Sequence, residues 1–267
     1  MCTPLPGRQS AASGRPPPCA AFTLIELLVV IVIIAILAGL LLPVFGSAKR
    51  KGYQTASISN LRQWGTALAA SLADHNNTFP HDGQGSGQIL ADHDDAWFNR
   101  LPPYISEKRI KDRQDVMPPK VGEKSLWINP GAPTTNNAKV KVGGPYLFCY
   151  AMNYWLYSKP ADGKPSGFVS MPSVEYPSGT VFMGENFELN YSVCNPKDIR
   201  ACYGIPEKED SSGNVIKNPE SVANFLFCDG HVRSLTRKEF EAKEATDDTA
   251  KTLNSAYTYI PYVGAPH

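Results

Sequence analysis

The sequence predicts an α+β fold in which one long N-terminal helix packs on an antiparallel β-sheet. The first observation is a run over residues 22–45 that carries no charge except Glu26, as expected of a membrane-spanning helix. Apolar residues then recur three or four positions apart at Leu61, Trp64, Leu68 and Leu72. This spacing predicts that the helix continues and buries one face. From Pro145 onward the chain is rich in aromatic residues and other strand formers, which favours a sheet.

The apolar run is long enough to cross a membrane once. As a helix, residues 22–42 would cover about 30 Å, close to the hydrocarbon thickness of a bilayer. A carboxylate at that depth costs roughly 2.5–3.5 kcal/mol even on lenient scales. We therefore expect Glu26 to meet a partner inside the membrane.

The residues around Glu26 read Phe-Thr-Leu-Ile-Glu-Leu-Leu-Val-Val-Ile over positions 22–31. This run resembles the N-terminal signal of type IV pilins and type II secretion pseudopilins. The resemblance implies that residues 1–21 are a leader, which prepilin peptidase removes by cutting between Ala21 and Phe22 before it methylates the new amine. Ala21 departs from the family, which normally has glycine there, so we expect slower cutting. Glu26 is then expected to pair with the Phe22 amine of a neighbouring subunit, because a paired ammonium and carboxylate cost less than two separate buried charges.

The same resemblance implies how the chain is divided and where it acts. Residues 22–45 become the transmembrane and assembly helix, and residues 46–267 the soluble domain, which includes the amphipathic half of the long helix. The resemblance implies that the chain is a structural subunit of a type II secretion pseudopilus or of a type IV pilus-like fibre. The residues do not distinguish between these two structures. The implied partners are copies of itself, other pseudopilins, prepilin peptidase and the inner-membrane assembly platform. The implied location is the inner membrane with the soluble domain outside the cytoplasm, and later a periplasmic pseudopilus or the cell surface.

Charge gives two further constraints. The formal net charge of +1 supplies no strong field, so nucleic-acid binding is disfavoured. The basic residues on the two sides of the apolar run do not support the orientation that the cleavage site requires. Three follow the run, namely Lys49, Arg50 and Lys51, and only Arg8 and Arg15 precede it. The positive-inside rule by itself mildly favours the reverse topology. We place the leader in the cytoplasm because the implied cleavage site must face it.

The clearest local signal in the soluble domain is a β-hairpin near its C-terminal end. Strand-forming residues flank Asp229 and Gly230, a pair that favours a type I′ turn because both residues tolerate positive φ. The region also resembles a pseudopilin-like subfamily that has an Asp-Gly-His-Val phrase and an upstream histidine. Pro219 stands in the place of that histidine. We interpret Asp229 and Gly230 as turn residues, and the alternative is a catalytic role for Asp229 and His231.

A short helix is predicted directly after this hairpin. Thr236-Arg237-Lys238-Glu239 matches a capping box, in which the first and fourth side chains satisfy backbone N–H groups of the first turn. We expect an amphipathic helix from there to about residue 244.

Four of the six cysteines lie outside the leader. An oxidising exterior would permit disulfides among them. Cys194 and Cys202 bracket a short proline-containing loop, so we predict a bridge between these two. Cys149 and Cys228 would then be buried thiols or a second bridge.

Polar residues with possible metal chemistry follow the amphipathic helix. His75, His81 and His93, with nearby aspartates, could bind a metal ion, although loops are rich in such residues in any case. We predict a surface loop, no metal site and no cofactor.

The sequence lacks the P-loop, Rossmann, GxSxG and HExxH fingerprints. We therefore predict a protein that is not an enzyme. The alternative is a signal-anchored cell-envelope enzyme or carbohydrate-binding module, with aromatic residues lining a ligand cleft. Those aromatic residues are Trp97, Trp127, Tyr154 and Trp155. The N-terminal run favours the first hypothesis, because an ordinary anchored enzyme needs no Phe-Thr-Leu-Ile-Glu.

Overall fold

The computed structural model describes residues 23–85, 88–89, 92–112, 125–131, 148–153, 156, 169–174, 176–186, 193–194, 199, 201–205, 207–210 and 215–241. Contacts within the chain group it into two compact units, Met1–Gly46 and Ser47–His267. The first unit contains the N-terminal part of helix α1. The second contains the rest of α1 together with the main β-sheet.

Helix α1 spans Leu24–Asp74 as one element of 51 residues, in agreement with the single long helix that the sequence predicts. Its two parts have different surroundings. Every large apolar side chain from Leu24 to Leu41 is at least 45% exposed, whereas Leu61, Trp64 and Leu68 are completely buried. This difference follows the sequence pattern, which is apolar all round in the first part and apolar on one face in the second.

The main sheet has six strands in the order β10-β9-β4-β3-β5, and β6 also pairs with β9. In chain order the strands are β3 (Tyr150–Asn153), β4 (Val181–Glu185), β5 (Val193–Cys194), β6 (Tyr203–Gly204), β9 (Ser221–Phe227) and β10 (Val232–Thr236). Every pairing in this sheet is antiparallel except the one between β3 and β5. The predicted α+β fold is confirmed, with one parallel pair at an edge of the sheet.

The remaining elements are short. They are β1 (Gln84–Gly85), β2 (Gln88–Ile89), α2 (Trp97–Arg100), the 3-10 helices η1 (Pro102–Ile105), η2 (Ile110–Asp112) and η4 (Met171–Ser173), β7 (Lys208–Glu209), β8 (Val215–Ile216) and α3 (Arg237–Glu241). Strands β1 and β2 form one separate antiparallel pair, and β7 and β8 form another.

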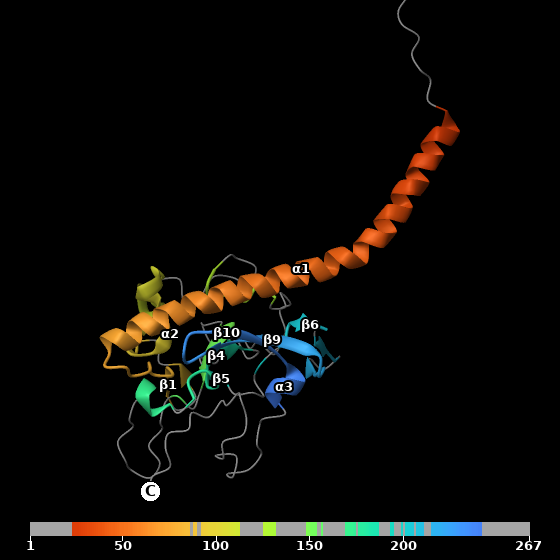
Figure 1. The fold of residues 1–267 in the computed structure, drawn as a ribbon. Helices are drawn as coiled ribbons and strands as arrows, with labels where there is room; N and C mark the ends of the chain where they lie inside the picture. Colours follow the sequence, from red (N-terminus) through yellow and green to blue (C-terminus); the bar gives the residue numbers. More distant parts are fainter. Residues whose placement is uncertain are drawn as a thin grey trace, which may run out of the picture. The chain divides into compact units, whose positions relative to one another are not determined.

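Helices α1 and α3 cover opposite faces of the main sheet (Figure 1). Successive side chains of a strand point to opposite faces, so each strand contributes to two cores. One core contains Trp64 of α1 together with Phe182 of β4 and Leu226 of β9. The other contains Phe225 of β9 and Phe240 of α3, whose ring centres lie 5.2 Å apart.

The two tryptophans that the alternative hypothesis places in a ligand cleft are core residues. Trp97 and Trp127 are 0% and 2% exposed, and their ring centres lie 5.7 and 5.0 Å from that of Trp64. Rings of this size contribute most to stability when they are buried, and here they fill the space beneath α1. The cleft role is therefore wrong for these two residues. Tyr154 and Trp155 lie outside the described residues.

The bridge predicted between Cys194 and Cys202 stays a prediction, because the side chain of Cys194 lies outside the described part of the structure. Cys194 lies in β5, whereas Cys202 directly precedes β6. Strand β6 lies on the β4 side of β9, because β10 occupies the other side at Val222. Strand β3 therefore lies between the two segments in the order of the sheet, which does not favour the bridge. Cys149 and Cys228 are buried thiols, which settles the choice left open for that pair.

Candidate functional site

The N-terminal site begins with a reciprocal cap on helix α1. The backbone N–H of Thr23 donates to Glu26 Oε2 over 2.8 Å, and Thr23 Oγ1 donates to the same oxygen over 2.7 Å. Thr23 Oγ1 in turn accepts from the N–H of Glu26 over 3.3 Å. This capping box satisfies N–H groups that lack partners within the helix. It holds the Glu26 carboxylate at the start of α1, and none of these bonds uses Oε1.

The apolar surface that follows this cap is uncovered. Leu24–Leu41 is the one stretch in the described part of the chain that is long and apolar enough to cross a membrane, and none of it is buried. Its mean hydropathy is 3.2. A helix that is apolar all round needs lipid or other apolar helices around it. Glu26 is the single charged residue in this stretch.

Ala21 and Phe22, the residues on either side of the predicted cut, lie outside the described residues. The described residues begin at Thr23, which caps α1. The cut therefore stays a prediction of the sequence.

A buried polar cluster joins the second part of α1 to the sheet. Glu185 of β4 is fully buried, and its Oε1 accepts from Ser57 Oγ of α1 over 2.5 Å. Asn224 of β9 donates its backbone N–H to Glu185 Oε2 over 2.8 Å and its Nδ2 to Oε1 over 2.9 Å. The hydroxyl of Tyr150 in β3 lies 2.9 Å from Ser57 Oγ and accepts from Asn60 Nδ2 over 3.4 Å. One helix and three strands thus contribute to one hydrogen-bonded cluster, in which Ser57 and Asn224 bind the carboxyl group directly.

Glu185 has hydrogen-bond donors but no cation beside it in the described part of the chain. Burial raises the pKa of Glu185 from 4.5 to about 7, while the donors from Ser57 and Asn224 act in the opposite direction. Burial also raises the pKa of Tyr150 well above its ordinary value. The Glu185 carboxyl therefore changes its protonation near neutral pH, inside the joint between α1 and the sheet.

The Asp-Gly turn of the hairpin has a different geometry from the predicted one. Gly230 N–H donates to Phe227 O and Phe227 N–H donates to His231 O, each over 2.9 Å, so the loop has three residues. Gly230 has a φ of +90°, but Asp229 is not among the described residues with positive φ. The hairpin therefore has a turn closed by one left-handed glycine, where the sequence predicts a type I′ turn with two such residues. Asp229 acts through its side chain, because its Oδ1 accepts from His231 N–H over 3.1 Å and lies 2.6 Å from His231 Nδ1.

The same turn lies directly against α1. A methyl group on Gly65 would come within 3.1 Å of Gly230 O and 2.9 Å of Leu226 Cδ1. Contacts this short force a neighbour to move, and here one neighbour is backbone. Gly65 therefore permits the close approach of the hairpin to the helix.

Helix α3 begins with the capping box that the sequence predicts. The backbone N–H and the Oγ1 of Thr236 donate to Glu239 Oε2 over 2.7 and 2.8 Å, and Thr236 Oγ1 accepts from Glu239 N–H over 3.3 Å. Pro219 lies next to this start, since its carbonyl accepts from Lys238 N–H over 3.1 Å. The described part of the helix ends at Glu241, and the residues that follow lie outside the described part.

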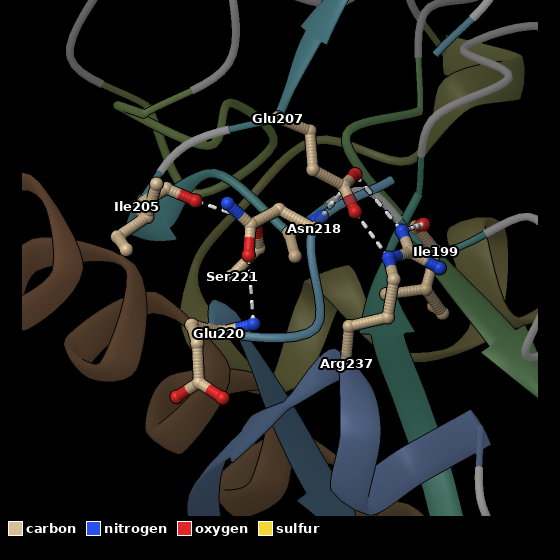
Figure 2. Close-up of polar contacts among 8 residues, drawn as sticks. Ile199, Ile205, Glu207, Asn218, Glu220, Ser221 and Arg237 are labelled. Atoms are coloured by element: carbon tan, nitrogen blue, oxygen red, sulfur yellow. Dashed lines mark hydrogen bonds and ion pairs between the residues drawn. The ribbon is translucent and has the colours of Figure 1, made fainter. Parts of the chain in front are cut away.

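Arg237 and Glu207 form a buried ion pair beside this second cap (Figure 2). Arg237 Nη2 donates to Glu207 Oε2 over 2.9 Å and to the Ile199 carbonyl over 2.8 Å, and Arg237 Nε donates to Glu207 as well. The guanidinium carbon lies 5.1 Å from the centre of the Phe240 ring. These contacts fix α3 to the chain segment that precedes β7.

The histidines considered for metal binding are engaged in local contacts. His81 is buried, its Nδ1 lies 3.1 Å from Asp82 Oδ1, and its ring stacks on that of His93 at 4.2 Å. His75 Nδ1 lies 2.9 Å from the Ser71 carbonyl oxygen. Among the described residues, no three His, Cys, Asp or Glu side chains are grouped to hold a metal ion. The loop is also less exposed than predicted, because His81 and Asp82 are both buried.

Sequence reasoning misses two parts of this arrangement. Thr23 and Glu26 match the same four-residue capping signature as Thr236 and Glu239, so the signal for the first cap is present in the sequence. Glu185 has no such signal, because its hydrogen-bond partners come from distant segments.

Comparison with known families finds one match, to the model of the prokaryotic N-terminal methylation motif, over residues 17–42. These residues include the predicted cleavage site, Thr23, Glu26 and the whole uncovered apolar stretch Leu24–Leu41. The match does not extend to the Asp-Gly turn, so it gives no support to the C-terminal resemblance. No curated protein and no solved structure matches the chain.

Proposed function

We propose that this chain, whose residues 17–42 match the prokaryotic N-terminal methylation motif, is a pilin-like substrate of prepilin peptidase and a structural subunit of a secretion pseudopilus or a pilus-like fibre. The observation that carries the proposal is Glu26, held by Thr23 at the start of an uncovered apolar helix. A carboxylate in hydrocarbon needs a cation beside it. The α-amine produced by a cut before Phe22 is such a cation, with an ordinary pKa of about 7.7–8.0.

The proposed assembly step pairs Glu26 of one subunit with the Phe22 amine of its neighbour. The capping box uses Glu26 Oε2, so Oε1 is the oxygen offered to the incoming amine. Pairing neutralises both charges in the membrane and fixes how far one helix stands above the next. The apolar surfaces of neighbouring stretches then pack against one another.

The proposed life history follows from this step. Prepilin peptidase cuts between Ala21 and Phe22 and methylates the Phe22 amine. The processed subunit is then held in the inner membrane as a single-pass protein until assembly. Its soluble domain stands outside the cytoplasm. The inner-membrane assembly platform then adds it to copies of itself and to other pseudopilins. The alternative of an anchored enzyme or carbohydrate-binding module loses its main support, because Trp97 and Trp127 are buried.

The substitution Glu26→Gln tests the charge separately from the cap. Glutamine still serves in a capping box, so the helix start is kept while the negative charge is removed. We expect unchanged membrane insertion and at least a ten-fold loss of polymer, measured by shearing and by cross-linking in cells. Normal polymer yield from Glu26→Gln would remove charge pairing from the proposal.

The matched variant is Thr23→Val, which removes the capping hydroxyl and keeps the carboxylate. We expect a smaller loss of polymer than with Glu26→Gln, because the ion pair can still form.

Intact-mass measurement of the protein from membranes provides the independent check on processing. A mature chain that begins at Phe22 with one added methyl group is expected, and a chain that retains residues 1–21 would contradict the proposed cut.

A further inference from the structure

A loop with an unusual backbone joins the end of α1 to the rest of the soluble domain. Helix α1 ends at Asp74, and Asn76 and Asn77 both follow with positive φ, +52° and +57°. Asparagine is one of the few residues other than glycine that adopts this conformation readily. Both side chains are exposed. Among the described residues, the side chain of Asn76 makes no hydrogen bond, so its Nδ2 points to no protein partner.

The sequence of this loop is an acceptor pattern for N-linked sugar. Asn76-Asn77-Thr78 has the form Asn-x-Ser/Thr with a residue other than proline in the middle. Asn77 does not fit the pattern, because Phe79 stands two residues after it. Two neighbouring asparagines in the same backbone conformation thus differ in this single respect.

Asn76 and Thr78, the two residues that define the pattern, both line one open depression on the surface. An open depression of about 300 Å³ is lined by Asp74, His75, Asn76, Thr78, Asp95 and Arg100. Its polar lining suits the hydroxyl groups of a sugar better than an apolar ligand. A sugar on Asn76 would stand at the rim of this depression and would displace no core residue.

We propose that Asn76 is an N-glycosylation site. The donor is an oligosaccharide carried on a membrane lipid through a diphosphate. The bond between sugar C1 and the diphosphate oxygen breaks, and a bond between C1 and Asn76 Nδ2 forms. The lipid diphosphate leaves with the bonding electrons as an anion, and Nδ2 gives up one proton to a base, for which the departing diphosphate suffices. The inference rests on the proposed topology, which places the soluble domain on the side of the membrane where such transferases act.

The transfer precedes folding of this loop. In the folded chain, Arg100 Nη2 donates to Thr78 O over 2.7 Å and Thr78 Oγ1 donates to His75 O over 2.7 Å. Met171 N–H also donates to Asn77 O over 2.7 Å, so the loop is fixed on both sides. A transferase needs the acceptor segment in its own binding cleft, which a loop fixed in this way does not offer. The folded structure then has to accept the product, and the exposure of Asn76 allows it.

The test is mass spectrometry of the full chain purified from the membranes of its native cells. We expect the peptide that contains Asn76 to be heavier by whole sugar residues. The added mass should disappear in Asn76→Gln and fall at least ten-fold in Thr78→Val, and it should persist in Thr78→Ser and in the control Asn77→Gln. Thermal melting of each variant shows whether it folds, and Thr78→Ser keeps the test valid if Thr78→Val does not.

An unmodified Asn76 peptide in the parent chain would overturn the inference, as would added mass that persists in Asn76→Gln. Protease digestion of intact spheroplasts separates this result from failure of the proposed function. A soluble domain that is accessible from outside but bears no sugar contradicts the glycosylation site alone. A domain protected in the cytoplasm contradicts both.

Discussion

Helices α1 and α3 begin with the same four-residue arrangement in different surroundings. In each, the threonine N–H and hydroxyl donate to one oxygen of a glutamate three residues later, at distances of 2.7–2.8 Å. Around Glu26 every large apolar side chain is uncovered, whereas the cap at Glu239 stands beside the buried pair of Arg237 and Glu207. The local motif is therefore the same and only the environment differs. The assembly function proposed for Glu26 therefore depends on the apolar surface next to it, since the cap by itself is common to both helices.

The strongest test of this comparison replaces each of the two glutamates with valine, in two separate variants. Glu26→Val should insert into the membrane at least as well as the parent chain and yield no polymer that can be sheared from cells, because the amine loses its counter-charge. Glu239→Val should assemble normally and lose only about 1 kcal/mol of free energy of unfolding, the usual contribution of a cap. Equal assembly defects in the two variants would show that Glu26 acts only as a cap.

The second prediction concerns the ion pair beside the α3 cap. Arg237→Met leaves Glu207 buried without its cation, so we expect the free energy of unfolding to fall by roughly 3–5 kcal/mol. Chemical denaturation of the detergent-solubilised chain measures this loss. The double variant Arg237→Met with Glu207→Leu should recover most of it, since no charge is then buried. A single variant as stable as the parent would mean that water reaches Glu207.

The third prediction extends the comparison to Glu185, a carboxyl buried without a cation. Its pKa is about 7 in the folded chain against an ordinary value of 4.5, so the folded state binds more protons between these two values. The contribution of this group to the free energy of unfolding is largest below pH 4.5. It falls by about 3 kcal/mol as the pH rises from 4.5 to 7, and it does not change further above pH 7. Denaturation at several pH values measures the slope. Glu185→Gln should remove this slope, and an unchanged slope in that variant would assign it to other groups.

The smallest expected effect is that of the α3 capping hydroxyl. Thr236→Val removes the donor to Glu239 and the acceptor for its N–H, which should lower the free energy of unfolding by about 0.5–2 kcal/mol. Thr66→Val is the matched control, because Thr66 is exposed in the middle of α1 and its hydroxyl only donates to Arg62 O. It should change stability by less than about 0.5 kcal/mol. Equal losses in the two variants would count against the cap.

Short-range patterns in this chain are readable from the sequence alone. The 51-residue helix follows from its apolar spacing, the cap of α3 from Thr236 and Glu239, and the hairpin from its Asp-Gly pair. Each depends on residues within one or a few turns of each other, so neighbouring side chains decide the outcome. The N-terminal signal is of the same kind, because it is one continuous run.

Only the tertiary structure decided which distant residues meet. Trp97 and Trp127 form core because α1 covers them, and strand β3 lies between the segments that carry Cys194 and Cys202. Burial raises the pKa of Glu185, and the hydrogen bond from Ser57 of α1, 128 residues away in sequence, opposes that rise. Burial and desolvation depend on every segment that packs around a group, and no local pattern encodes them. The sequence by itself thus determined the long apolar helix and its single charge, whereas the packing of the sheet against α1 decided the environment of Glu185 and of the buried tryptophans.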